Sequence, residues 1–421
     1  MLDIKPGIVK KATVCVPGSK SYTHRMLIAA ALSDGRCTVD NPLKSEDTII
    51  TRKCLTHLGV TIKEIHNGLE VHGSNGCLKG SAIPLDLGNS GTSMRLLTAV
   101  AVLGKGGVTL TGTRRMQERP IQDLLDGLNQ MGVTARSLKG NGCPPVEIIG
   151  GNLKGGKVAL DCRISSQFLS ALLLIAPFAA QTVDIEVTNG LVSKPYVDMT
   201  VDVMDQYGIV VDRQGYEQFA VRSGQTYRSG AYRVESDCSQ AGYFWGAAAI
   251  TGADIKVIGT SLTSRQGDVR LTECLKNMGC QVVQVNDGIR VIGGPLKGIS
   301  VDMADLPDMV PTLAVVAAFA RGTTVIKNVA HLRAKESDRL SAVAAELSKM
   351  GVAVDCGANE LRIEGGNPKG ATIDTYDDHR IAMSFALAGL KVPGVKIKAE
   401  NCVRKSFPNF WTVLNSLSAG I

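Results

Sequence analysis

Aromatic side chains are scarce in this sequence. Phe, Trp and Tyr make up 4% of its 421 residues, and only two residues are Trp. Single-stranded nucleic acids bind to aromatic platforms on which their bases stack, so this composition argues against a nucleic-acid partner. The charge balance gives no contrary signal, because 46 Lys and Arg against 39 Asp and Glu leave a net charge of only +7. This mild excess suits small acidic substrates and is too small to indicate nucleic acid.

Cysteine motifs and long apolar runs are also absent. The 11 cysteines are scattered between Cys15 and Cys402 without a C-x-x-C pair, which argues against a zinc site or a disulfide framework. We expect free thiols in a reducing cytoplasm and no metal. The segment MLDIKPGIVKK has no apolar core of a signal peptide. No apolar run approaches the roughly 18 residues that a membrane span needs, so we expect a cytoplasmic protein without a membrane partner.

The sequence does contain a repeat. Six polar clusters each precede an Ala- and Leu-rich run: GSKSYTHR (18–25), GNSGTSMR (88–95), RISSQF (163–168), ESDCSQAG (235–242), DLPDMVP (305–311) and YDDHR (376–380). The apolar runs recur about every 70 residues, which predicts one structural unit repeated six times. Each cluster then lies at a helix N-terminus, where free N–H groups and a positive partial charge attract anions. The repeat therefore indicates a protein that holds small anionic molecules.

Two further periodic elements support the repeat. Gly59, Gly132, Gly208, Gly279 and Gly351 each follow a helix-like segment and fit the left-handed position after a helix end. Strand-like segments follow the apolar helices at 37–42, 107–112, 183–187, 255–259, 323–329 and 395–399. These patterns predict a mixed unit in the order helix, strand, helix, strand, strand. The sixth unit is cut short after a helix near 410–418, and we expect the N-terminal segment to complete it.

The chain is too long for one ordinary core, and six units divide into two groups of three. We expect one discontinuous domain of residues 1–18 plus 236–421 and one inserted domain of residues 19–235. The two connections, at about 17–19 and 234–237, would form a hinge. Each polar cluster alone also fits a solvated helix start, a basic loop or a Pro-containing turn. Only their joint placement on one repeated architecture favours a binding site.

The clusters together resemble the 5-enolpyruvylshikimate-3-phosphate synthase family of enolpyruvyl transferases. The resemblance covers essentially the whole chain and rests on PGSKSYTHR, LGNSGTSMR, RRMQERPI, SSQF, VSKPY, KESDRL, DDHRIAM and CVRKSFP, in the family's order and spacing. It implies an α/β (α+β) fold of two domains, each with three βαβαββ repeats, as an inside-out α/β barrel closing over the substrates. It also implies a transferase of the shikimate pathway, which leads to chorismate and the aromatic amino acids. The reaction moves the enolpyruvyl group of phosphoenolpyruvate to the 5-hydroxyl of shikimate 3-phosphate and releases phosphate.

The resemblance implies the ligand contacts residue by residue. Shikimate 3-phosphate would be held by Lys20, Ser21, Arg25, Ser165, Ser166, Gln167, Ser193, Tyr196, Asp308, His331 and Lys335. Phosphoenolpyruvate would be held by Lys20, Asn89, Gly91, Arg119, Gln167, Arg339, Arg380 and Lys405. Both ligands carry phosphate and carboxylate, which Arg clamps through two parallel hydrogen bonds. No metal or organic cofactor is implied, and the enzyme would be a monomer.

The reaction requires two proton transfers. Asp308 is the candidate base for the attacking hydroxyl. Glu336 is the candidate acid for the methylene carbon of phosphoenolpyruvate. Lys20 and Lys405 would neutralise the leaving phosphate, and His379 would assist by hydrogen bonding. The division of the proton-transfer roles among Glu336, Lys405 and His379 stays open.

Two positions depart from the family pattern. Leu96 follows Arg95 where many members have Pro, and this change could reshape the glycine turn. His331 stands where some members have Asn, and this change could retune affinity. Gly91 is retained, so we expect inhibition by glyphosate, which occupies the phosphoenolpyruvate site in this family.

Two other functions fit parts of the sequence. The sister enzyme that transfers enolpyruvyl to UDP-N-acetylglucosamine has the same fold, but most members use a loop Cys as proton donor. Residues 112–120 read GTRRMQERP, without Cys. A non-enzymatic scaffold for RNA or other polyanions fits the basic excess and the repeats. The low aromatic content and the pairing of acids with the Arg clusters argue against it.

Overall fold

The computed structural model describes residues 1–417 and contains two compact units. Unit 1 is Met1–Pro17 together with the chain from Glu235 onward, and unit 2 is Gly18–Val234. The chain therefore passes between units twice, after Pro17 and after Val234. The role of these two connections as a hinge stays a prediction.

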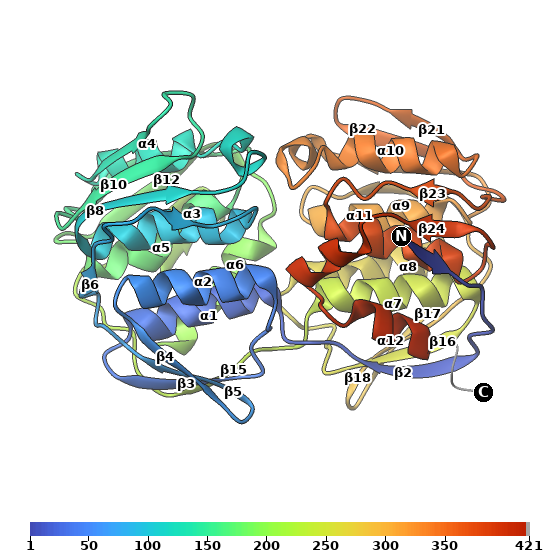
Figure 1. Cartoon of the computed structure of the whole chain (residues 1–421), viewed down its shortest axis with the longest axis horizontal. Helices are drawn as coiled ribbons and strands as arrows, with labels where there is room; N and C mark the ends of the chain where they lie inside the picture. Colours follow the sequence, from blue (N-terminus) through green and yellow to red (C-terminus); the bar gives the residue numbers. More distant parts are fainter. Residues whose placement is uncertain (418–421) are drawn as a thin grey trace. The chain divides into compact units, whose positions relative to one another are not determined.

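Unit 2 contains three sheets (Figure 1). The first is β15 (Ala231–Arg233), β3 (Arg36–Asp40), β5 (Gly68–His72) and β4 (Thr61–Ile65). The second is β6 (Leu78–Lys79), β8 (Gly104–Thr111), β10 (Val146–Gly150) and β9 (Thr134–Ser137), with β7 (Leu85–Asp86) also paired to β8. The third is β11 (Gly156–Cys162), β12 (Val183–Leu191), β14 (Gln218–Val221) and β13 (Asp212–Gln214). The first and third sheets each contain one parallel pair, β15 with β3 and β11 with β12, whereas in the second both β6 and β7 run parallel to β8. Antiparallel strands continue each sheet, as a βαβαββ unit requires.

The helices of unit 2 alternate between inner and outer positions. The inner helices are α1 (Lys20–Leu32), α3 (Gly91–Val100) and α5 (Gln167–Ile175), and nearly all their residues are buried. The outer helices are α2 (Glu46–His57), α4 (Gln122–Gln130) and α6 (Pro195–Gln206), and each buries only one side. A helix that is apolar all round must be enclosed, whereas an amphipathic helix covers a core. The Ala- and Leu-rich runs are therefore the central helices.

Unit 1 repeats this pattern. Its complete sheets are β17 (Gln281–Val285), β18 (Gly288–Ile292), β16 (Asp254–Ile258) and β2 (Lys11–Cys15), and then β19 (Ser300–Asp302), β20 (Thr323–Lys327), β22 (Glu360–Glu364) and β21 (Ala353–Cys356). The inner helices are α7 (Cys238–Thr251), α9 (Val310–Ala317) and α11 (His379–Gly389). The outer helices are α8 (Leu271–Met278) and α10 (Arg339–Lys349). The mixed α/β fold class expected from the sequence is thus confirmed.

The last sheet of unit 1 is completed from the other end of the chain, as expected. The strands β23 (Thr372–Ile373) and β24 (Val395–Ile397) are parallel, and β1 (Leu2–Ile4) pairs antiparallel with β24. The sequence predicted a helix near 410–418, and α12 spans Phe410–Ser416; position 418 lies outside the described residues. β2 joins the sheet of β16, and β15 joins the sheet of β3. Each connection between units thus starts from a strand paired within the unit that it leaves.

The predicted helix ends are confirmed by backbone geometry. Gly59, Gly132, Gly208, Gly279 and Gly351 all have positive φ, from 77° at Gly351 to 118° at Gly279. The six predicted strands coincide with β3, β8, β12, β16, β20 and β24, within a few residues at their ends.

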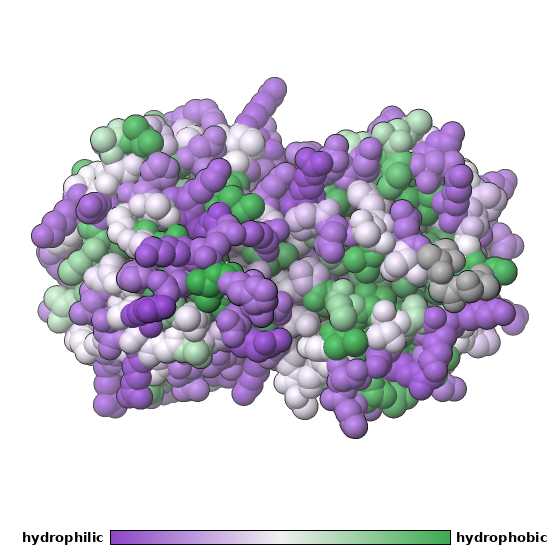
Figure 2. All heavy atoms as spheres, turned by 60° about the horizontal axis from the view of Figure 1, so that its bottom comes forward, coloured by the Kyte–Doolittle hydropathy of each residue, from purple (hydrophilic) through white to green (hydrophobic). Residues whose placement is uncertain are grey.

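The surface is mixed in character. Figure 2 shows hydrophilic atoms over much of the face that it presents, with hydrophobic atoms in patches between them. The most exposed large hydrophobic side chains include Ile8, Ile83 and Val210, which lie in distant segments. Among the described residues, no helix has the length and apolar character needed to cross a membrane.

Candidate active site

Lys20 begins the inner helix α1 of unit 2. Ser19 caps this helix by accepting a hydrogen bond from the Tyr22 N–H. The Lys20 ammonium is almost buried, and its Nζ lies 3.2 Å from Asp47 Oδ2 at the start of α2. A buried ammonium needs such a carboxylate partner. Asp47 therefore holds Lys20 at the N-terminal end of two neighbouring helices.

Arg25 is the most deeply buried cation of unit 2, with 1% of its surface exposed. Its Nε donates to Thr200 Oγ1 at 2.7 Å, and its Nη2 donates to the Tyr196 carbonyl at 3.0 Å. Burial lowers the pKa of Arg25 to about 10, so the guanidinium stays charged at neutral pH. Its contacts bring the start of α6 to α1, as the motifs SKSYTHR and VSKPY would need if they bind one ligand.

Gly91 and Arg119 are in close contact. Arg119 follows the short helix η2 (Met116–Glu118), and its Nη1 donates to the Asn89 carbonyl at 3.2 Å. A Cβ on Gly91 would lie 2.4 Å from Arg119 Nη2, so any side chain at this position would displace the guanidinium group. Arg119 is 3% exposed, whereas the Arg114 side chain is 97% exposed and pairs with Glu118. Of the three arginines in this basic segment, Arg119 is therefore the one built into the core.

Gln167 connects α5 to α3. Its Nε2 donates to Thr92 Oγ1 at 3.0 Å, and its Oε1 accepts from Arg95 Nη1 at 3.1 Å. Ser165 Oγ accepts from the Gln167 N–H at 3.3 Å. Leu96, the departure from the family pattern, is fully buried in α3.

Ser193 is held in an unusual conformation just before α6. It has φ 55°, a left-handed conformation that is rare for serine. Its hydroxyl oxygen is buried and has no hydrogen-bond partner among residues 1–417. An unsatisfied buried hydroxyl costs free energy, and strained polar positions of this kind cluster at ligand sites. The Ser193 hydroxyl therefore has unused hydrogen-bonding capacity.

In unit 1, Asp308 lies between two arginines. It belongs to η5 (Pro307–Met309), which leads directly into α9. Its Oδ1 accepts from Arg339 Nη1 at 2.8 Å, and its Oδ2 accepts from Arg380 Nη2 at 2.5 Å. Both guanidinium groups are nearly buried, with 1% and 3% of the residue exposed. The structure therefore brings together three side chains that are far apart in the sequence.

Arg339 is the centre of a larger ionic network. Its Nε donates to Asp378 Oδ2 at 2.8 Å, and its Nη2 donates to Glu336 Oε2 at 2.9 Å. Burial lowers the pKa of Arg339, but the neighbouring carboxylates, led by Asp378, outweigh burial and raise it above the usual arginine value. Asp378 also caps α11 by accepting from the Arg380 N–H at 3.0 Å. The N-terminal ends of α9, α10 and α11 thus meet at these charges.

His331 lies next to this network, in η6 (Ala330–Ala334). Burial first, and then the positive charge of Lys335, lower the pKa of His331 to about 3. The imidazole is therefore neutral at physiological pH. His379 is fully buried at the start of α11, and Lys405 is nearly buried at the end of η7 (Glu400–Lys405).

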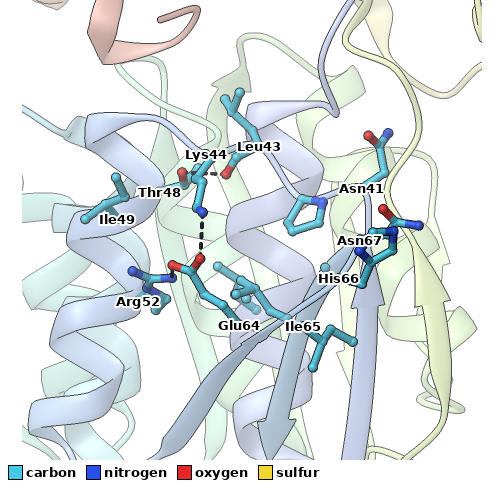
Figure 3. A pocket seen from close by; sticks show the side chains of 14 residues that line it. Asn41, Leu43, Lys44, Thr48, Ile49, Arg52, Glu64, Ile65, His66 and Asn67 are labelled. Carbon is cyan, nitrogen blue, oxygen red and sulfur yellow. Dashed lines mark hydrogen bonds and ion pairs between the residues drawn. The ribbon is translucent and has the colours of Figure 1, made fainter.

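A surface pocket lies in unit 2 (Figure 3). Its volume is about 240 Å³, and Glu64 accepts from both Lys44 and Arg52, each at 2.6 Å, on its wall. The Lys44 hydrogen bond and then that of Arg52 lower the pKa of Glu64 to about 2. No candidate residue of the sequence lines this pocket. Within residues 1–417, no group of His, Cys, Asp and Glu side chains has the arrangement of a metal site.

Comparison with known proteins gives a consistent result. The sequence model of EPSP synthase (3-phosphoshikimate 1-carboxyvinyltransferase) matches residues 5–414. A 3-phosphoshikimate 1-carboxyvinyltransferase of Syntrophobacter fumaroxidans is 44% identical over 413 residues, which are 97% of each chain. One of Methanosphaerula palustris is 45% identical, over 96% of this chain and 95% of the relative. The chain belongs to the EPSP synthase family. The structure agrees, because an EPSP synthase of Acinetobacter baumannii superposes with a TM-score of 0.83 at 31% identity, over 99% of this chain and 97% of that one.

Within this EPSP synthase fold, several neighbours of the motif residues were not predicted from the sequence. Asp47 pairs with Lys20, Thr200 binds Arg25, and Asp378 binds Arg339. Asp268 was also missed: it accepts a hydrogen bond from Ser239 near the start of α7. Burial, and next the charge of Asp308, raise the pKa of Asp268 to about 7. Only Asp378 carried a signal in the sequence, as part of YDDHR.

Proposed function

We propose that this protein transfers the 1-carboxyvinyl group of phosphoenolpyruvate to the 5-hydroxyl of shikimate 3-phosphate and releases phosphate. The observation that carries the proposal is the full-length family match over residues 5–414. The buried cations at the inner helix N-termini suit the reaction, because both substrates are phosphorylated carboxylates.

The proposed contacts for shikimate 3-phosphate follow the motifs. In unit 2 they are Lys20, Ser21, Arg25, Ser165, Ser166, Gln167, Ser193 and Tyr196, and in unit 1 Asp308, His331 and Lys335. The buried Ser193 hydroxyl without a partner supports this assignment, because a ligand oxygen would satisfy it. The neutral state of His331 means that it would act as a hydrogen-bonding group and not as a cation.

Phosphoenolpyruvate would be bound by Lys20, Asn89, Gly91, Arg119, Gln167, Arg339, Arg380 and Lys405. The contact of Arg119 with the backbone at Asn89 leaves its other guanidinium nitrogens directed at the Cβ position of Gly91. A glycine at this position lets a ligand approach the backbone closely. Glyphosate would compete for the same cations, which is the basis for the expected inhibition.

The Asp308 network suggests how the proposed base becomes active. Both carboxylate oxygens of Asp308 are occupied by Arg339 and Arg380. An anionic group of phosphoenolpyruvate that binds these guanidinium groups would replace Asp308 as their partner. The released carboxylate is then able to accept the proton of the attacking 5-hydroxyl.

The chemistry then proceeds by addition and elimination. The 5-oxygen bonds to C2 of phosphoenolpyruvate while Glu336 gives a proton to the methylene carbon C3. In the second step the C2–O bond to phosphate breaks, Glu336 takes a proton back from C3, and the double bond forms again. Lys20 and Lys405 would stabilise the charge of the departing phosphate, and His379 would assist by hydrogen bonding.

An acceptor-exchange experiment tests this function. The purified protein would be incubated with phosphoenolpyruvate and either shikimate 3-phosphate or UDP-N-acetylglucosamine, and the products identified by mass spectrometry. We expect the carboxyvinyl ether of shikimate 3-phosphate only. A product from the nucleotide sugar alone would assign the sister reaction, and binding of polyanions without turnover would indicate a scaffold.

We further propose that the enzyme is cytoplasmic and monomeric. All 11 cysteines are free thiols, as expected in a reducing compartment. Size-exclusion chromatography with light scattering would test the oligomeric state.

A further inference from the structure

Two consecutive residues in front of α11 have a strained backbone. Tyr376 and Asp377 both have φ 54°, in the left-handed region that residues with a side chain rarely adopt. Neither is glycine, so the conformation persists only if surrounding contacts enforce it. The strained pair directly precedes Asp378, which binds Arg339, and Arg380, which binds Asp308.

Glu346 supplies such contacts from the helix α10. Its side chain is completely buried, and its Oε1 accepts from the Tyr376 hydroxyl at 2.7 Å. Its Oε2 accepts from the backbone N–H of Asp374 at 3.0 Å. One carboxylate therefore binds the segment on both sides of Thr375.

Lys349 provides the charge that lets this carboxylate be buried. Its Nζ lies 2.8 and 2.9 Å from the two oxygens of Glu346 and 2.7 Å from Asp374 Oδ2. The hydrogen-bonding capacity of this buried carboxylate is therefore met by a cation and by further donors. Because these donors have fixed positions, the carboxylate is held rigidly. The chain of contacts therefore transmits the position of α10 to the strained segment.

The same face of α10 binds the segment at two points. Arg339 and Glu346 are seven residues apart, so they lie on one side of the helix, roughly 10 Å apart along its axis. Arg339 binds Asp378 after the strained pair, and Glu346 binds Asp374 and Tyr376 before and within it. The segment 374–378 is thus fastened to α10 at both ends.

We propose that Glu346 is a positioning residue for the reaction, because it holds the strained 374–378 segment in the conformation that places Asp378 and Arg380. Glu346 is not among the proposed substrate contacts and would act only through this segment. The inference rests on the proposed function, in which Arg339 and Arg380 bind phosphoenolpyruvate. A misplaced guanidinium group weakens binding at its own ligand and leaves the other ligand's contacts in unit 2 unchanged.

Steady-state kinetics of two variants test this role. Glu346→Gln keeps the size of the side chain but removes its charge and one acceptor, and we expect the KM for phosphoenolpyruvate to rise about tenfold. The KM for shikimate 3-phosphate should stay within about twofold of the wild-type value. Tyr376→Phe removes one hydrogen bond from a half-exposed ring and should raise the KM for phosphoenolpyruvate about threefold. The control is Glu273→Gln, on the exposed side of α8.

A purely structural role predicts a different result. Partial unfolding lowers the active fraction, so kcat falls while both KM values stay constant. That pattern, or a Tyr376→Phe variant with wild-type constants, would overturn the proposal. If Glu346→Gln does not fold, Tyr376→Phe decides the question alone.

Hydrogen exchange separates this inference from the proposed function. Amide exchange in a peptide covering 374–380 should be faster in Glu346→Gln and Tyr376→Phe than in the wild type, with no change in α8. This measurement needs no substrate, so it tests whether Glu346 holds the 374–378 segment even if the wild-type protein has no turnover. Unchanged exchange in this peptide would refute the positioning role of Glu346. Absent turnover in the wild type would refute the proposed transfer reaction.

Discussion

At the scale of single residues, the carboxylates of unit 1 matter as much as its arginines. Two guanidinium groups, of Arg339 and Arg380, meet three carboxylates, of Asp308, Glu336 and Asp378. A buried cation without such partners would be costly. The network therefore keeps the cations in place without substrate, and in the proposed mechanism the guanidinium groups would exchange Asp308 for an anionic group of phosphoenolpyruvate.

The variant Gly91→Ala should selectively weaken the binding of phosphoenolpyruvate. The new methyl group would lie 2.4 Å from Arg119 Nη2, so the guanidinium must move. We expect the KM for phosphoenolpyruvate to rise about tenfold, which corresponds to about 1.4 kcal/mol. The control is Gly107→Ala, because a Cβ at Gly107 meets no atom within 4 Å.

Glyphosate should inhibit the wild-type protein in competition with phosphoenolpyruvate and should inhibit Gly91→Ala less. Inhibition constants for both proteins would be measured at several phosphoenolpyruvate concentrations. A wild-type enzyme that stays active at high glyphosate concentration would contradict the assignment of this position.

Glu336→Gln should retain both ligands and lose most of its turnover. The amide is close to the carboxylate in shape but cannot donate a proton to C3. In D2O, the wild-type enzyme should incorporate deuterium at the methylene group of the product, and the variant should not. Substrate binding would be checked by calorimetry, and full activity in the variant would transfer the proton-donor role to another group.

His331 should make the protein less stable in acid. Its pKa is about 3 in the folded state, mainly through burial, against an ordinary value of 6.5. Below pH 6.5 the unfolded chain binds a proton that the folded protein excludes, so stability is lost as the pH falls from 6.5 toward 3.

The variant His331→Gln removes this proton-linked loss. Its Tm should fall less than that of the wild type between pH 7.5 and pH 5. His57→Gln, at an exposed site on α2, is the matched control and should behave as the wild type. Parallel Tm curves for wild type and His331→Gln would show that His331 titrates normally.

Single residues also show how far the sequence alone predicts the site. Arg114 and Arg119 occupy one short basic motif, and only the family pattern distinguished them before the structure showed that Arg119 alone is buried. The neighbours Asp47, Thr200 and Glu346 could not be predicted, because their partners are 27, 175 and 30 residues away. Such contacts depend on how helices pack, and a repeat pattern does not specify this.

At the scale of elements, the alternation of inner and outer helices explains where the polar clusters lie. Inner helices such as α3, α5 and α11 are almost entirely buried, so only their first turns can present polar groups. Their polar clusters are therefore all at N-terminal ends. This part of the fold was predictable, because a continuous apolar run and a preceding polar cluster are both visible in the sequence.

The strand β1 should contribute measurably to stability, because it completes the last sheet of unit 1. Ile4 is buried in this strand and pairs with Val395 of β24. Ile4→Ala should lower the free energy of unfolding by about 2–4 kcal/mol. Ile8→Ala is the control, since Ile8 is 64% exposed. Equal denaturation curves for the two variants would mean that β1 is not part of the folded core.

At the scale of the whole molecule, the chain builds two units of three sheets and crosses between them twice. The N-terminal strand β1 lies with β24, and β2 lies with β16, so unit 1 is closed by residues from both ends of the sequence. The incomplete sixth repeat indicated this arrangement. The spacing of the repeats did not predict that β2 would pair with β16 or that β15 would pair with β3. Spacing along the sequence does not specify which strands pair in the folded unit.

The central claim is that the polar clusters of both units serve one reaction between phosphoenolpyruvate and shikimate 3-phosphate. The most direct test is phosphate release by the purified protein with both substrates and with each one omitted. We predict release only when both are present, and its loss in Arg25→Ala of unit 2 as well as in Arg380→Ala of unit 1. Release from phosphoenolpyruvate alone, or full activity in either variant, would contradict the claim.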